Sequence, residues 1–300
     1  IDKDSVFLIT CSHYFSVERH LNSFGFYNVF DSLFLINEHL KKSNLNKDKH
    51  RDVDRAHEAL LVKRNYIKKQ FDKFIIPSLD LILTEKCSLK CVDCANLMPY
   101  FKSPKDSELG VMLNNLEIIL EKVDAITELR ILGGEPFLFR QINEVLKFCL
   151  FQKKIPNIII YTNGTIVPRV ETLEYLNNDK IVLEITDYGK LSRNFDKLVK
   201  TCVDKKINFL IRELGESWDD SANIIKSTRS EKEDQRIFEE CCAKYLFTLM
   251  HGKIYRCPFS ASLDALKKIT LHNNNSQIID KNLSKEELQK FIFGTTFVDS

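Results

Sequence analysis

The chain has 300 residues, of which 44% are hydrophobic, so it can bury a full core and is expected to hold one large domain with smaller appendages. A total of 44 Lys and Arg against 42 Asp and Glu gives a net charge of +2, which argues against nucleic acid or an anionic membrane as a partner. The sequence predicts neither a transmembrane helix nor a signal peptide. Nine cysteines without a secretory signal indicate reduced thiols and metal ligands in a cytoplasmic protein.

Residues 1–40 are predicted to be the remnant of an N-terminal α/β domain. An apolar strand is expected at Val6–Thr10, and a helix is expected to follow His13–Phe15. The chain does not begin with Met, so we expect it to be a fragment whose parent carries the beginning of this domain.

Residues 41–77 are rich in Lys and Arg and are predicted to be a basic helical connector. A nucleic-acid patch is the alternative interpretation. Aromatic residues within this segment are limited to Tyr66, Phe71 and Phe74, which favours the solvated connector.

From Ser78 onward, apolar strands alternate with helical segments, a pattern typical of a parallel sheet built from βαβ units. Because the carboxyl ends of parallel strands meet at one edge, the polar residues that follow each strand are expected to gather there. The predicted strands are Leu79–Thr84, Leu129–Leu132, Asn157–Tyr161, Ile181–Ile185 and Ile207–Ile211.

Three cysteines follow the first of these strands with the spacing C-x3-C-x2-C, at Cys87, Cys91 and Cys94. Thiolates suit iron–sulfur clusters, copper(I) and zinc. A four-iron cluster held by only three cysteines keeps one iron without a protein ligand, where a small molecule can chelate. Half of a structural zinc site is the alternative.

The second predicted strand leads into the run Gly133-Gly134-Glu135-Pro136. Two glycines allow close backbone approach, the carboxylate is an acceptor for an ammonium group, and the proline fixes the exit of the chain. By itself the run also fits an ordinary strand-to-helix turn.

Together the two motifs resemble those of the radical S-adenosylmethionine superfamily. The resemblance implies a partial (β/α)6 barrel as radical S-adenosylmethionine core over residues 78–240, with a 4Fe-4S cluster on the three cysteines and the methionyl group of S-adenosylmethionine at Gly133, Gly134, Glu135 and Pro136. It implies reductive cleavage to a 5'-deoxyadenosyl radical, with no catalytic residue beyond the cluster and cofactor ligands. A reductase such as flavodoxin or ferredoxin is the implied electron donor.

The resemblance extends less specifically to the ends of the third and fourth strands. Thr162 and Asn163 are expected to face the cofactor, and Thr186 or Asp187 to meet its ribose hydroxyls. Asn163-Gly164 is equally a turn dipeptide and the run after Asp187 an ordinary loop, so both interpretations stay open.

One position departs from the family pattern, which carries an aromatic residue immediately before the third cysteine. This chain has Asp93 there. The adenine is then expected to pack against another residue, with Tyr100 and Phe101 as the candidates.

A second cysteine group lies beyond the core, at Cys241, Cys242 and Cys257, around a hairpin that is predicted to turn at His251-Gly252. Residues 241–300 thereby resemble the SPASM and twitch extensions, which bind an auxiliary iron–sulfur cluster. Either the auxiliary site is degenerate or its missing ligands lie past Ser300, and we expect the second. Small buried hydrophobes are the alternative interpretation of these three cysteines.

The remaining cysteines, Cys11, Cys149 and Cys202, are expected to be core thiols, and Trp218 to be a lid residue or an anchor of a polar loop. A capped helix is expected from Ser284.

These features predict a radical S-adenosylmethionine enzyme that removes hydrogen from a small molecule or peptide. The preferred substrate is a sugar or nucleotide-sugar of surface-polysaccharide biosynthesis. The alternatives are a maturase of a ribosomally made peptide and a non-catalytic iron–sulfur or zinc-binding protein.

Overall fold

The computed structural model describes residues 7–9, 21, 29–31, 74–213, 229–241, 246–268 and 275–293. The connector up to residue 73, together with Cys11, Trp218 and Cys242, lies outside the described residues. The chain divides into two compact units, Ile1–Asp72 and Lys73–Ser300. In the first unit, strand β1 (Phe7–Ile9) pairs in parallel with β2 (Val29–Asp31), so the strand predicted at its start is present.

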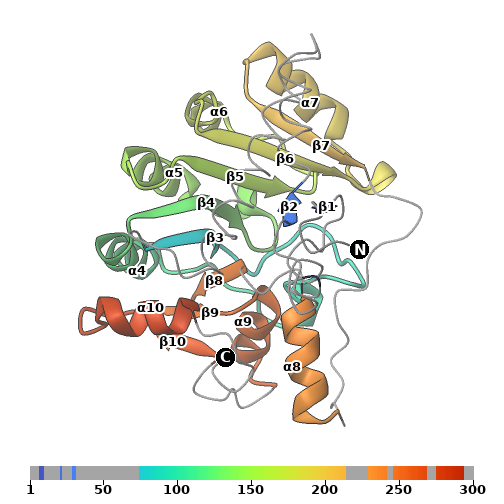
Figure 1. Cartoon of the computed structure of the whole chain (residues 1–300). Coiled ribbons are helices and arrows are strands. Elements are labelled where there is room, and N and C mark those ends of the chain that lie inside the picture. The colour runs from blue at the N-terminus through green and yellow to red at the C-terminus, as the bar shows by residue number, and fades with distance from the viewer. Residues whose placement is uncertain are drawn as a thin grey trace. The chain divides into compact units, whose positions relative to one another are not determined.

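The second unit is built on a sheet with the order β10-β9-β8-β3-β4-β5-β6-β7 (Figure 1). Six neighbouring strands, from β8 to β7, run parallel, and the β9 and β10 pairings are antiparallel. The strands are β3 (Ile75–Ile82), β4 (Ala125–Leu132), β5 (Asn157–Thr162), β6 (Ile181–Asp187), β7 (Phe209–Glu213), β8 (Leu246–Met250), β9 (Lys253–Tyr255) and β10 (Ser276–Ile278).

Helices connect the parallel strands and follow the sheet in the same order (Figure 1). Each crossover from β3 to β7 contains one α-helix, as parallel pairing requires. These crossover helices are α4 (Leu109–Lys122), α5 (Ile142–Phe151), α6 (Val170–Leu176) and α7 (Phe195–Asp204), and the later helices are α8 (Glu231–Glu240), α9 (Pro258–Ala265) and α10 (Lys285–Phe293).

One face of the sheet forms the apolar core. The strand register aligns Leu79, Leu129 and Ile158, all with 0% exposure, and their neighbours along each strand alternate between the two faces. Most buried positions of the crossover helices, such as Leu116 and Leu146, are also apolar. Burial of these side chains provides the main driving force for folding of this unit.

The other face carries charged side chains. Asp80 on β3 forms an ion pair of 3.3 Å with Arg130 on β4, and the Arg130 guanidinium lies 4.7 Å from the centre of the Tyr161 ring on β5. Glu184 on β6 pairs with Arg212 on β7 at 3.5 Å. This second face therefore combines paired charges with buried apolar side chains such as Ile76 and Ile159.

The structure confirms the predicted α/β class and the parallel sheet, whose edges are β7 and β10. Closure into a partial (β/α)6 barrel stays a prediction.

The predicted hairpin at His251-Gly252 is present, but its first strand pairs with β3 inside the main sheet, which the sequence did not predict. The cap at Ser284 is confirmed by its hydroxyl, which accepts from Glu287 N at 3.1 Å. No helix in the described ranges is long and apolar enough to cross a bilayer.

Candidate metal and cofactor site

The cysteine loop leaves the carboxyl end of β3, so its three thiols lie beyond the edge where the parallel strands end. Cys87, Cys91 and Cys94 are half-buried free thiols. Within the part of the chain that the structure describes, no three His, Cys, Asp or Glu side chains form an assembled metal cage. The ligand role of these cysteines therefore stays a prediction.

The electrostatics of this loop suit a cation. Burial raises the pKa of the Cys87 thiol to about 11, and negative charge on Glu135, Cys94 and Cys91 adds to the increase. Burial, followed by the charge of Cys94, also raises the pKa of Cys91. Three thiolates would thus repel one another in a partly desolvated loop, and bound iron would relieve that repulsion.

The two glycines after β4 fit closely against the start of the cysteine loop. Gly134 N donates to Thr84 O, and Glu135 N donates to Lys86 O, both at 2.8 Å. A Cβ on Gly133, which has φ +147°, would lie 2.4 Å from Thr84 O, and a Cβ on Gly134 would lie 2.0 Å from Lys86 O. The close backbone approach that the sequence predicted here is therefore an approach to the chain's own cysteine loop.

The Glu135 side chain is fully buried and joins the ends of β4 and β5. Its Oε1 accepts from Thr162 Oγ1 at 2.9 Å and from Phe137 N at 3.3 Å, while its Oε2 accepts from Asn163 N at 2.9 Å. Burial raises the pKa of this carboxyl to about 7, against the opposing effect of the three donors. The predicted ammonium-accepting role stays a prediction, whereas the internal contacts were not predicted.

Asn163 extends this network to the cysteine loop. Its Nδ2 donates to Ser88 Oγ at 3.0 Å and lies 3.7 Å from Cys87 Sγ. Its Oδ1 accepts from Thr165 N at 3.1 Å. The structure thus brings Asn163 to a predicted cluster ligand, while the Thr162 hydroxyl is directed at Glu135.

At the end of β6, the side chain next to the cysteines is Tyr188, which the sequence reasoning missed. Its hydroxyl forms a hydrogen bond with the Cys91 thiol. Asp187 Oδ1 accepts from Gly189 N at 2.7 Å, as in a local Asx turn. Thr186 lies beside them, and the predicted cofactor roles of Thr186 and Asp187 stay predictions. The only signal for Tyr188 was an aromatic residue at a strand end.

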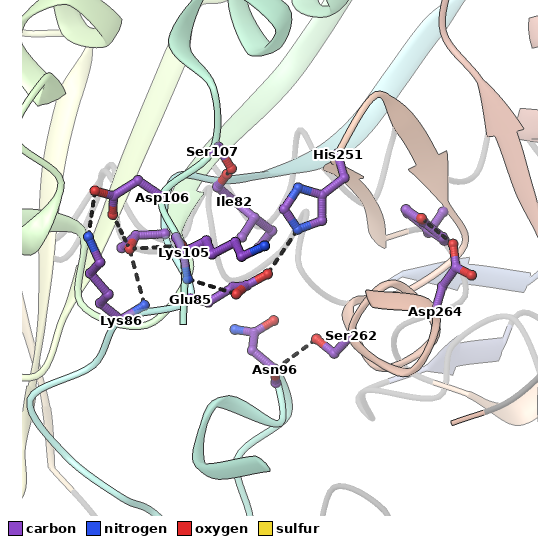
Figure 2. A network of polar contacts seen from close by, with 12 residues as sticks. Ile82, Glu85, Lys86, Asn96, Lys105, Asp106, Ser107, His251, Ser262 and Asp264 are labelled. Atoms are coloured by element: carbon purple, nitrogen blue, oxygen red, sulfur yellow. Dashed lines mark hydrogen bonds and ion pairs between the residues drawn. The ribbon is translucent and has the colours of Figure 1, made fainter. Parts of the chain in front are cut away.

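Polar contacts hold the start of the cysteine loop on both sides (Figure 2). Glu85 accepts from Lys105 N at 2.8 Å through one oxygen and lies 2.9 Å from His251 Nε2 through the other. Lys86 Nζ pairs with Asp106 Oδ2 at 2.7 Å. The turn of the C-terminal hairpin therefore contacts the strand-end residue two positions before Cys87.

The far end of the loop is also tied to the C-terminal part. Asn96 Nδ2 donates to Gly133 O at 3.3 Å, and Ser262 Oγ on α9 donates to Asn96 O at 2.8 Å. Phe101 packs against a cluster that includes Met250 of the hairpin, and Tyr100 is 51% exposed. The predicted adenine contact of either residue stays a prediction.

The second cysteine group is only partly described. Cys257 caps α9, where its sulfur accepts from Ser260 N at 3.4 Å. Cys241 is exposed at the end of α8, and Cys242 lies outside the described residues. A second cluster stays a prediction. Cys149 and Cys202 are buried, which confirms the expectation of core thiols for these two.

Part of this chain is similar to a known protein family and to known proteins. A family model described as a 4Fe-4S single cluster domain matches residues 80–209, a range that contains the cysteine loop and the double-glycine turn. A GTP 3',8-cyclase of Campylobacter jejuni subsp. doylei is 30% identical over 95 residues, covering 32% of this chain and 29% of the relative. Molybdenum cofactor biosynthesis protein 1 of Drosophila melanogaster is 26% identical over 179 residues, covering 54% and 31%.

The chain is similar to members of the radical S-adenosylmethionine superfamily, and the family model covers residues 80–209 of its 300. It spans less than a third of the length of the curated relatives it matches. Among solved structures, native anSMEcpe with bound AdoMet has a TM-score of 0.47 and 12% identity, covering 74% of this chain and 80% of that one. Streptococcus suis SuiB bound to precursor peptide SuiA has a TM-score of 0.43 and 15% identity, covering 93% and 78%.

The cofactors of the radical S-adenosylmethionine superfamily are a 4Fe-4S cluster and S-adenosylmethionine, and the residues of this chain fit both. Three soft thiol donors in one half-buried loop suit the cluster. The backbone of the double-glycine turn lies directly against that loop. Cluster and turn would therefore be neighbours at the carboxyl edge of the sheet.

Proposed function

We propose that this chain is a radical S-adenosylmethionine enzyme whose cluster is held by Cys87, Cys91 and Cys94. The observation that carries the proposal is the joint fixation of the two motifs by the backbone bonds from Gly134 to Thr84 and from Glu135 to Lys86. A structural zinc loop has no need of a closely packed glycine turn from a neighbouring strand. A cofactor that must touch both the cluster and the turn does need it.

When bound, the reduced cluster supplies the electron that cleaves S-adenosylmethionine and so generates the radical that removes hydrogen from a substrate. The protein's own residues supply position and shielding. Glu135 and Asn163, both buried, lock the ends of β4 and β5 together. Tyr188 and Asn163 supply polar hydrogens beside the thiols.

For the substrate, we propose a sugar or a nucleotide-sugar. The charged face of the sheet, with Asp80, Arg130 and Glu184, supports a polar substrate. Two of the curated relatives that match are named GTP 3',8-cyclase, and GTP contains a sugar. If a peptide is modified and nucleotide-sugars are not, the substrate is a peptide and this proposal is overturned.

The test is anaerobic reconstitution with iron and sulfide, followed by iron quantification and an assay for 5'-deoxyadenosine with dithionite. The wild type is expected to hold about four irons or more and to form 5'-deoxyadenosine. Replacing the three loop cysteines together by Ala removes every protein ligand of this cluster. The variant is expected to lose about four irons and all of the product.

The control is Cys202→Ala, which changes a buried cysteine on α7 outside the loop. It is expected to keep the irons and the product of the wild type. Zinc in the purified wild type, with no 5'-deoxyadenosine under full reduction, would identify the loop as a structural metal site and overturn the proposal. About four irons retained by the triple variant would establish a second cluster.

A further inference from the structure

The orientation of the Asn163 side-chain amide is fixed by its neighbours. Its oxygen lies 3.1 Å from Thr165 N, and a backbone N–H can only donate, so the amide oxygen must be on that side. The amide nitrogen is then the other terminal atom, which lies 3.0 Å from Ser88 Oγ and 3.7 Å from Cys87 Sγ. Ser88 Oγ also lies 3.3 Å from the amide oxygen. The N–H group aimed at the sulfur is thus a consequence of the hydrogen-bond network.

The rest of the residue holds this amide in place. Asn163 is 9% exposed. Its backbone N–H donates to Glu135 Oε2 at 2.9 Å, and its carbonyl accepts from Ser192 Oγ at 2.6 Å. A side chain anchored at both backbone groups and at its amide oxygen cannot swing away from Cys87 without breaking several hydrogen bonds.

An N–H donor changes the electronic properties of a thiolate that ligates iron. Reduction adds an electron to the cluster, and part of the added charge resides on the sulfurs. A hydrogen bond to sulfur stabilises that charge, so it stabilises the reduced state more than the oxidised one. Hydrogen bonds to the sulfurs are among the factors that set the reduction potential of iron–sulfur clusters.

We propose that Asn163 is a positioning residue that raises the reduction potential of the cluster by donating its amide N–H to Cys87 Sγ. The inference rests on the proposed function, because it requires a cluster on Cys87. It differs from a cofactor-binding role, in which the amide would contact S-adenosylmethionine. The two roles separate experimentally, because only the proposed one acts on the cluster when S-adenosylmethionine is absent.

The test is the midpoint potential of the reconstituted cluster without S-adenosylmethionine, measured by an EPR-monitored redox titration. Asn163→Asp keeps the shape and the acceptor for Thr165 N but replaces the NH2 group with an oxygen. Asn163→Leu removes the donor without adding charge. Both potentials are expected to shift to more negative values. A tenfold fall in the ratio of reduced to oxidised cluster at a fixed potential corresponds to a shift of about 59 mV.

The matched control is Asn194→Asp. Asn194 Nδ2 donates to Thr165 O at 2.6 Å. The control therefore makes the same Asn-to-Asp change in a residue that bonds to the backbone of the same residue, Thr165, as Asn163 does. This control is expected to leave the potential close to that of the wild type. A potential that moves equally in Asn194→Asp and Asn163→Asp, or that stays at the wild-type value in both Asn163 variants, would overturn the inference.

The outcomes also separate the two proposals. Absence of an iron–sulfur cluster in the wild type would overturn both the proposed function and this inference. A wild type that holds the cluster and forms 5'-deoxyadenosine, combined with unchanged potentials in the variants, would leave the function standing and overturn the role of Asn163 alone. Weaker binding of S-adenosylmethionine at an unchanged potential would assign the amide to the cofactor instead.

Discussion

Gly134→Ala is expected to abolish binding of the cluster. The added Cβ would lie 2.0 Å from Lys86 O, 2.4 Å from Lys86 C and 2.9 Å from Cys87 N. All three atoms belong to the backbone, so no flexible side chain can turn aside to make room. The cysteine loop must move away, which breaks the bond from Glu135 N to Lys86 O at 2.8 Å. The iron bound by the cysteine loop is then expected to fall from about four per chain to less than one.

The control for this prediction is Gly110→Ala. Gly110 lies in α4, and a Cβ there meets nothing within 4 Å. Ala is a better helix former than Gly, and Gly110 lies in the first turn of α4, so the variant is expected to be stabilised by at most about 0.5 kcal/mol and to keep its iron. Iron quantification and thermal unfolding of both variants check the pair. Full iron in Gly134→Ala would show that the loop does not need this close contact.

Glu135→Gln is expected to remove a large part of the pH dependence of stability. Burial raises the pKa of Glu135 from 4.5 to about 7 in the folded chain. A group with a raised folded pKa stabilises the fold fully below its unfolded pKa, and this stabilisation is lost as the pH rises through the folded pKa. Between pH 4.5 and pH 8 the wild type should lose about 3 kcal/mol through this one group.

The Gln side chain does not titrate, so the variant keeps whatever stability it has across this range. The Gln side chain also destabilises the fold by an amount that does not change with pH. Its NH2 group would face Asn163 N or Thr162 Oγ1, which both donate to the carboxylate of the wild type, so one of these donors would lose its acceptor. The quantity to compare is the difference between the unfolding free energies of the two proteins, measured by denaturant titration at several pH values. As the pH rises from 4.5 to 8, the unfolding free energy of the variant should increase relative to that of the wild type by about 3 kcal/mol. Parallel curves would show that Glu135 does not titrate in this window.

The local parts of the fold could be predicted from the sequence because their signals are local. Apolar runs such as Asn157–Tyr161 correspond to β5 (Asn157–Thr162), and the Ser284–Glu287 spacing corresponds to a cap with bonds of 2.8 and 3.1 Å. The cysteine spacing pointed to the metal chemistry for the same reason. Each of these patterns is contained within a few residues.

The parts that could not be predicted depend on pairs of residues far apart in the sequence. The segment Leu246–Met250 pairs with β3 as well as with the second strand of its own hairpin. Nothing in this short apolar segment indicates the pairing with β3. The burial of Glu135 against Thr162 and the approach of Tyr188 to Cys91 likewise follow from the pairing of four strands, β3 to β6, in one sheet. A single sequence gives the side chains at each strand end but not their directions.

The pairing of β8 with β3 bears on the order in which the protein assembles during synthesis. β3 carries the cysteine loop, yet one of its two neighbouring strands is Leu246–Met250, near the other end of this chain. Until that segment leaves the ribosome, β3 is an edge strand with unpaired backbone groups, which are prone to wrong pairing. The Glu85–His251 contact at 2.9 Å forms at the same late stage. Stable insertion of iron is therefore expected to follow synthesis of the hairpin, well after the cysteines themselves have been made.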